Sequence, residues 1–208
     1  MKKKTTRAFI HGFLDNETQS LFKHLRALKD KSQFEQPLLL PTHIYQGYRA
    51  KTEAYRVLVD DSLCTTEVRT GYAVPGMLLV ETRLKFPPSR RYRPGEYSSR
   101  PKNLDFEGIT RQLHSISTEL GTVIHAGTFG KELGIFLCKT GHELENLSFS
   151  PGEKALFDNR TLVQNIEFCT NMYTSLISQA SALKERVHNH INLVNTINHK
   201  TNSLLTRR

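Results

Sequence analysis

Residues 166–197 read IEFCTNMYTSLISQASALKERVHNHINLVNTI, and this stretch decides how the rest of the chain is organised. It belongs to a longer segment, Glu153–Arg208, that contains none of the chain's 12 glycines and 8 prolines. Apolar residues recur along it at alternating steps of three and four, which places them on one stripe of an α-helix. These residues are Ile166, Cys169, Tyr173, Leu176, Ala180, Leu183, Val187, Val194, Ile197 and Leu204. The pattern predicts a long amphipathic helix.

This helix has signals at both ends and an unusual length. Asp158 or Asn159 can cap its start, and the arginines at 207 and 208 suit the negative end of the helix dipole. Unbroken, it would extend about 70 Å. A compact domain made from the remaining residues would have a radius of gyration of only about 15 Å. We therefore expect either a break, near Ala182–Glu185 or His188–His190, or a partner that holds the outer part of the helix.

The composition excludes several classes of protein. The 208 residues are 38% apolar and 24% charged, and no apolar run approaches the roughly 20 residues that span a bilayer. The basic start, Lys2–Lys4, is not followed by the apolar region of an export signal. The three cysteines lack the spacing of a disulfide framework. We expect a soluble protein in the reducing cytosol, without membrane insertion.

Two further helices are predicted upstream. The first covers Asn16–Lys29 and is followed by a connector bracketed by Pro37 and Pro41, because proline cannot continue a helix. The second begins at Asn103, runs to about Leu120 and has Gly121 as its C-terminal cap. Its expected apolar face consists of Phe106, Ile109, Leu113, Ile116 and Leu120.

The rest of the chain is rich in β-branched and aromatic residues between turn residues, which predicts two blocks of strands. The first block comprises Thr42–Ala50, Ala54–Asp60, Leu63–Thr70 and Met77–Phe86. The second comprises Thr122–Ala126, Leu133–Lys139 and Glu143–Ser150, with Gly127, Gly130, Gly141 and His142 as turn residues. The predicted fold class is α+β: antiparallel sheet with helices on one face over residues 1–152, and the long helix packed on this core over residues 153–208.

A proline- and arginine-rich segment, PPSRRYRPGEYSSRP at residues 87–101, predicts a surface loop. Its cationic and aromatic candidates for partner binding are Arg90, Arg91, Tyr92, Arg93, Tyr97 and Arg100. Arginine binds phosphate or carboxylate in bidentate fashion, and tyrosine can stack on bases. The net charge of +9 likewise favours an acidic protein or nucleic acid as partner. A solvated loop without a ligand is the third interpretation.

A second candidate site comprises His125, Cys138 and His142, which the predicted strands could bring together. Such a group could form part of a zinc site, or a nucleophile with its base. The chain supplies no complete set of four zinc ligands, and a buried thiol in the core is the favoured interpretation of Cys138. His190 lies on the apolar stripe, where a polar residue can set register, titrate near neutrality, or mark the point at which the stripe becomes exposed.

The predicted order of helix, strand block, helix, strand block and long helix resembles that of small bacterial secretion chaperones. It also resembles the adaptor subunits that attach to the coupling protein of the Legionella-type type IV secretion system. The resemblance implies a cytosolic, non-catalytic protein that binds extended segments of client proteins. Those chaperones are commonly acidic, whereas this chain is basic.

The sequence contains no catalytic signature, and we expect neither an enzyme nor a cofactor. The predicted function is that of an adaptor or chaperone-like subunit of a larger complex. Its partner surface would combine the arginine-rich loop with the apolar stripe of the long helix at Leu183, Val187, Val194 and Ile197. The alternatives are a nucleic-acid-binding protein that uses the loop, and an enzyme with a dispersed Cys/His site.

Overall fold

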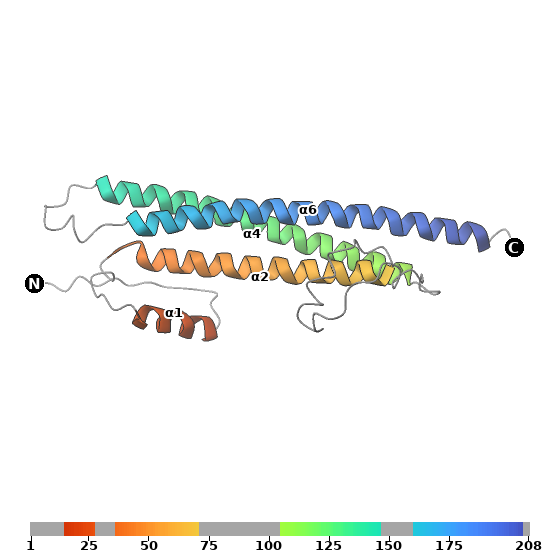
Figure 1. Cartoon of the computed structure of the whole chain (residues 1–208), viewed down its shortest axis with the longest axis horizontal. Helices are drawn as coiled ribbons and strands as arrows, with labels where there is room; N and C mark the ends of the chain where they lie inside the picture. The colour runs from red at the N-terminus through yellow and green to blue at the C-terminus, as the bar shows by residue number, and fades with distance from the viewer. Residues whose placement is uncertain (1–14, 28–35, 71–104, 147–159, 206–208) are drawn as a thin grey trace, which may run out of the picture.

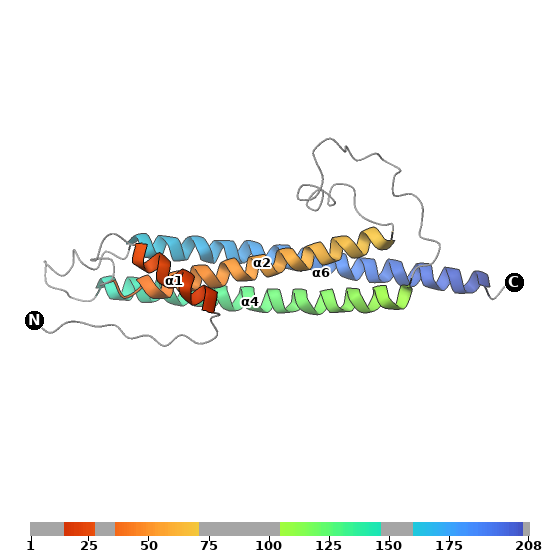
Figure 2. The same cartoon turned by 90° about the horizontal axis from the view of Figure 1, so that it is seen from below.

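The computed structural model describes residues 15–27, 36–70, 105–146 and 160–205, and these residues form four helices. They are α1 (Asp15–Ala27), α2 (Leu39–Thr70), α4 (Phe106–Asn146) and α6 (Arg160–Leu205). The last three form an elongated bundle in which α2 and α6 run in the same direction and α4 runs in the opposite one (Figure 1). Helix α1 lies alongside the N-terminal half of α2, on the side away from α4 and α6 (Figures 1 and 2).

The predicted α+β fold class is wrong, because the described residues contain no strand. The three predicted strands between Thr42 and Thr70 form the single helix α2. Residues 122–146, predicted as strands and turns, are the second half of α4. The strand predicted at Met77–Phe86, the loop at 87–101 and residues 147–150 lie outside the described residues. The strand blocks behind the resemblance to secretion chaperones are therefore helical wherever the structure describes them.

The buried stripe of α2 is not recognisable from apolar residues alone, because it also contains threonine and arginine. It begins at Leu38, just before α2, and follows steps of four and three throughout; Arg49 and Arg56 are half-buried and the other members are buried. The members are Leu38, Thr42, Tyr45, Arg49, Thr52, Arg56, Val59, Leu63, Thr66 and Thr70. Three of its buried threonines donate their hydroxyl protons to the carbonyl oxygen four residues back, at 2.7–2.9 Å. Each hydroxyl is satisfied within its own helix, so its methyl group can pack in the core as an apolar side chain would. The strand propensity of threonine was overridden by this tertiary packing.

Pro41 lies in the first turn of α2 rather than in a connector. The first backbone N–H groups of a helix have no partner within the helix, so proline removes no hydrogen bond there. The start of α4 is fixed by a different residue from the one predicted. The backbone N–H of Gly108 donates to the Asp105 carboxylate at 2.9 Å, which makes Asp105 the N-terminal cap, and Asn103 lies outside the described residues.

Helix α4 also continues far beyond Gly121, the residue predicted to end it. The predicted apolar face is buried at Ile109, Leu113, Ile116 and Leu120. The same steps of three and four then continue through glycine at four positions: Val123, Gly127, Gly130, Gly134, Leu137 and Gly141. These glycines face a neighbouring helix at close range, so they serve packing rather than turns.

The predicted long helix is confirmed as α6, a single helix of 46 residues without either of the expected breaks. Ten of its residues form a buried row: Val163, Ile166, Cys169, Tyr173, Leu176, Ala180, Leu183, Val187, His190 and Val194. At about 1.5 Å per residue α6 is about 69 Å long. Most of this length is covered within the chain, because the rest of the fold is elongated too: α2 and α4 have 32 and 41 residues. Only the C-terminal turns of α6 extend past both neighbouring helices (Figure 1).

Candidate interaction surface

Glycine residues of α4 allow α4 and α6 to pack closely against each other. A side chain on Gly130 would overlap the ring of Tyr173, and one on Gly134 would overlap the hydroxyls of Tyr45 and Thr170. The two helices can therefore approach closely enough to enclose both tyrosines. The Tyr45 and Tyr173 ring centroids are 5.5 Å apart, and the hydroxyls of Tyr45 and Thr170 share a hydrogen bond of 3.0 Å. Around these two tyrosines the interface is a tightly packed core.

Tyr173 is completely buried, and its hydroxyl oxygen has no hydrogen-bond partner. Burial raises the pKa of the Tyr173 phenol, and the neighbouring Tyr45 and Tyr48 raise it further. The Thr52 hydroxyl acts in the opposite direction on this pKa. That hydroxyl already donates to the carbonyl oxygen of Tyr48 at 2.9 Å, and no hydrogen bond of standard geometry reaches Tyr173. A buried hydroxyl without a hydrogen bond costs about 1–3 kcal/mol of folding free energy. The buried Tyr173 side chain therefore stabilises the fold less than its packing alone would suggest.

A cluster of polar side chains joins α2 to α6. Arg186 of α6 donates to both carboxylate oxygens of Glu67 of α2, from Nε at 2.6 Å and from Nη2. Its Nη2 also donates to Cys64 Sγ at 3.5 Å, and Nη1 lies 3.7 Å from the Asp60 carboxylate. Burial raises the pKa of the Cys64 thiol, with the Arg186 hydrogen bond acting in the opposite direction. A thiol that stays protonated is a poor nucleophile. The ion pairs and hydrogen bonds of Arg186 link α2 to α6.

The third interface, between α2 and α4, has a different character. Its contacts recur at multiples of seven residues along α2, as expected for long helices that pack side by side. Tyr48 packs edge-on against Phe129 at a centroid distance of 6.0 Å. One heptad along α2, the hydroxyl of Tyr55 donates to Glu119 at 3.3 Å, and further along, Arg69 donates to Gln112 at 2.9 Å.

Large apolar side chains remain exposed along this third interface. Phe129 and Phe136 of α4 are 53% and 61% exposed, and Leu58 of α2, one turn beyond Tyr55, is 64% exposed. We call Phe129, Phe136, Tyr55 and Leu58, with the half-buried Tyr48 between them, the α2–α4 apolar face. The two phenylalanines are seven residues apart, which is about 10.5 Å along the helix axis. A row of this kind is typical of a surface that binds another protein.

The described helices carry almost no net charge. They contain 13 lysines and arginines against 14 aspartates and glutamates, out of 29 and 20 in the whole chain. The basic excess therefore belongs to the sequence outside the described helices, chiefly residues 1–14 and 71–104. The bundle itself is not a basic surface for a polyanion.

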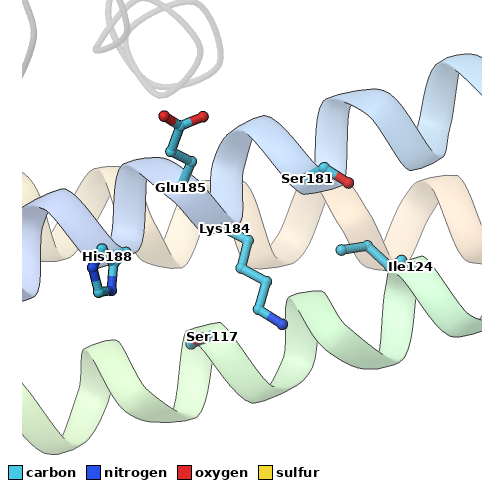
Figure 3. A pocket seen from close by; sticks show the side chains of 6 residues that line it. All are labelled: Ser117, Ile124, Ser181, Lys184, Glu185 and His188. Atoms are coloured by element: carbon cyan, nitrogen blue, oxygen red, sulfur yellow. The ribbon is translucent and has the colours of Figure 1, made fainter.

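A shallow open groove of about 380 Å³ lies between α4 and α6. Figure 3 shows Lys184 reaching from α6 across to α4 beside Ser117. Lys184 also lies near Gly121, where a Cβ would make only ordinary van der Waals contact with its ammonium group at 3.8 Å. The lining residues are Ser117, Ile124, Ser181, Lys184, Glu185 and His188. Because the charged members of this set are exposed and of mixed sign, we assign no chemistry to this groove.

The predicted Cys/His site does not assemble. His125, Cys138 and His142 all lie on α4, and the two histidines are 17 residues apart, or about 25 Å along one helix. Both histidines are exposed, and His142 lies 3.7 Å from the Glu145 carboxylate. Burial raises the pKa of the half-buried Cys138 thiol. Within the described ranges, no group of three His, Cys, Asp or Glu side chains is arranged to hold a metal ion.

The other predicted site residues have different locations. Arg90, Arg91, Tyr92, Arg93, Tyr97 and Arg100 lie outside the described residues. On α6, Leu183, Val187 and Val194 are buried in the core of the chain's own bundle, and Ile197 is half-buried. The stripe that we expected to hold a partner is therefore largely occupied by α2 and α4.

The α2–α4 apolar face was missed because the segments that form it were read as strands. The signal was present in the sequence: Phe129 and Phe136 are seven residues apart and fall between the core positions of α4. Recognising this face from the sequence requires knowing that the segment is helical and which residues face the core. Glycines at four of those core positions interrupt the apolar pattern that would show this.

None of the helices described has an apolar stretch long enough to cross a membrane. Comparison of the chain with protein-family models, with curated proteins and with solved structures finds no match.

Proposed function

We propose that this protein is a non-enzymatic, adaptor-like subunit that binds a partner protein through the α2–α4 apolar face. The observation that carries the proposal is the pair of exposed rings Phe129 and Phe136, with Tyr48 packed against Phe129 and the exposed Leu58 ten residues further along α2. Exposed aromatic side chains in a row are costly in water and are typical of a surface that a partner covers.

The partner that this face suits best is an amphipathic helix. The spacing of Phe129 and Phe136 matches the heptad repeat of a helical apolar stripe, so a helix of the partner could interdigitate with the two rings. Tyr48 packs against the ring of Phe129 and limits how far it can rotate. An added strand is disfavoured, because the described part of the chain offers no sheet edge to pair with.

The charge of the bundle supports an apolar mode of binding. Since the described helices are close to neutral, the long-range attraction that gathers polyanions is weak over them. Binding at this face should therefore depend on buried apolar area and tolerate salt.

Two neighbouring residues provide a matched test. Ile135 and Phe136 are similarly exposed, at 55% and 61%, but adjacent helical residues point about 100° apart, so only Phe136 belongs to the face. We would purify tagged wild-type protein, Phe136→Glu and Ile135→Glu from the native lysate with their bound proteins and quantify each partner by mass spectrometry. Phe136→Glu should lose the partner, whereas Ile135→Glu should retain it at the wild-type level.

Equal loss in both variants, or no loss in either, would overturn the proposal. The thermal midpoints of all three proteins would be measured to ensure that each is folded. Because both substitutions place a glutamate at an exposed position of the same helix, a general effect of charge or helix stability would appear in both.

Nucleic acid remains the second candidate partner, supported by the basic excess outside the described helices, which includes Arg90, Arg91 and Arg93. This alternative predicts that affinity for single-stranded nucleic acid falls steeply with salt and weakens when those three arginines are changed to glutamine. In the purification above, it predicts that nuclease treatment releases the bound material. A partner that resists nuclease and is lost in Phe136→Glu would support the adaptor proposal instead.

A further inference from the structure

The C-terminal turn of α2 is attached to α6 by a buried histidine. His190 of α6 is only 6% exposed, and its Nε2 lies 2.9 Å from the hydroxyl oxygen of Thr70, the last residue of α2. The Thr70 hydroxyl donates its single proton to the carbonyl oxygen of Glu67 at 2.7 Å. Thr70 must therefore accept from His190, which places the proton of the neutral imidazole on Nε2.

The surroundings of His190 disfavour a positive charge. On α6, Val187 and Val194 flank it one turn away on either side, and α4 contributes Ile109 and Leu113 to the same core cluster. The charged and titratable residues at that end of α4, Asp105, Glu107, Arg111 and His114, are all exposed, and Glu107 lies 3.6 Å from Arg111. On α2, Arg69 is engaged with Gln112.

The charges that act on His190 are those of the α2–α6 cluster. Among the described residues, Glu67 is the only buried carboxylate, and both of its oxygens already accept from Arg186. The imidazolium would thus lie near a guanidinium whose counter-charge is already used. Burial lowers the pKa of His190, Glu67 acts to raise it, and Arg186 lowers it again.

We propose that the contact between His190 and Thr70 is a pH-sensitive clasp that releases the C-terminal turns of α2 from α6 when His190 is protonated. Protonation adds a second N–H at Nδ1 and a charge that the apolar surroundings cannot solvate. The least costly response is local opening, because the end of a helix separates from a bundle more easily than its middle. This proposal is independent of the partner-binding function, since it involves none of the residues of the α2–α4 apolar face.

Amide hydrogen exchange measured by mass spectrometry at pH 7.5 and pH 5.5 tests the clasp in the full chain, with labelling times corrected for the intrinsic effect of pH. The wild-type protein should lose protection over residues 60–70 at pH 5.5, while residues 39–52 keep theirs. In His190→Gln the amide can still donate to Thr70 and cannot be protonated in this range, so the loss should disappear. His188→Gln changes an exposed histidine two residues away and should behave as the wild type does.

Two results would overturn the clasp. One is the same loss in His190→Gln as in wild type; the other is a loss spread evenly along α2. If His190→Gln did not fold, an NMR titration of the wild-type histidine rings would decide without a variant. His190 should then titrate below the ordinary imidazole pKa of 6.5, together with the amide shifts of residues 67–70. Titration of His190 at or above that value, or without the amide shifts, would contradict the proposal.

Discussion

Gly130 of α4 lies against the ring of Tyr173 of α6 so closely that a methyl group on Gly130 would overlap the ring atoms. At this position, replacing glycine by alanine should have the opposite of its usual effect on stability. Replacing a helical glycine by alanine normally stabilises by about 0.5–1 kcal/mol, because the backbone loses less entropy on folding. At Gly130 the added methyl group would instead force apart two helices that are packed to the density of a crystal.

We therefore predict opposite effects for two substitutions of the same type. Gly130→Ala should lower the free energy of unfolding by about 1–3 kcal/mol, the usual cost of overpacking a core. Gly47→Ala should raise it by about 0.5–1 kcal/mol, because Gly47 is exposed on α2 and has open space around its Cα. Urea unfolding followed by circular dichroism would measure both. A stabilising Gly130→Ala would mean that α4 and α6 are not in close contact.

The two buried tyrosines should also respond differently to loss of their hydroxyls. Tyr173→Phe removes an oxygen without a hydrogen-bond partner, so the free energy of unfolding should stay constant or rise by up to about 1 kcal/mol. Tyr45→Phe removes the 3.0 Å hydrogen bond to Thr170 and should lower it by about 1 kcal/mol. Thermal and urea unfolding would distinguish the two. Equal destabilisation would indicate that a partner satisfies the Tyr173 hydroxyl.

Breaking the ion pair between Glu67 and Arg186 should be far more costly than breaking one at the surface. Arg186→Met leaves the Glu67 carboxylate buried without a counter-charge and should cost about 3–5 kcal/mol. Adding Glu67→Leu should restore much of this loss, because an apolar pair has no charge to desolvate. Glu107→Gln, in the exposed pair with Arg111, should change the free energy of unfolding by less than about 1 kcal/mol. Urea unfolding of Arg186→Met, Glu67→Leu, their double variant and Glu107→Gln would test these values, the first three completing a double-mutant cycle.

The stability of the whole chain should depend on pH through His190. Its pKa is lowered in the folded state from the ordinary value of 6.5, so between the two pKa values the unfolded chain binds more protons. The contribution of His190 is therefore complete above about pH 6.5 and is lost progressively as the pH falls through this value. The free energy of unfolding at pH 5.5 should fall below that at pH 7.5, and His190→Gln should reduce the difference. Wild-type and variant curves of the same slope would contradict this prediction.

The parts of the fold that were predictable are those whose pattern consists almost entirely of apolar residues. Helix α6 was recognised because residues such as Ile166, Leu176 and Val187 mark its turns, with His190 as the one polar residue of the buried row. The first half of α4 was recognised because Ile109, Leu113 and Ile116 do the same. Helix α2 and the rest of α4 have an equally regular register, but Thr52, Thr66, Gly130 and Gly134 occupy core positions in it. Threonine favours strands and glycine favours turns when each is considered in isolation, so the prediction from local sequence was wrong.

The candidate site was less predictable than the fold. Which side chains form the α2–α4 apolar face depends on how α2 and α4 are aligned, and no local pattern contains that information. Conversely, Leu183 and Val187 had the expected amphipathic spacing, but the same spacing serves a bundle core and a docking surface equally well.

The sequence by itself determined that the residues of α6 form an amphipathic helix and that no described helix has an apolar stretch long enough to span a membrane, because periodicity and hydropathy are properties of neighbouring residues. That α6 continues through 46 residues without a break was decided by the structure. Only the tertiary structure decided that Gly130 and Gly134 belong inside a helix and that the threonines of α2 belong in a core. A glycine stabilises a helix pair when a ring such as that of Tyr173 fills the space it leaves, and a threonine packs as an apolar residue when its hydroxyl is satisfied by its own backbone. Both conditions depend on contacts between residues far apart in the chain.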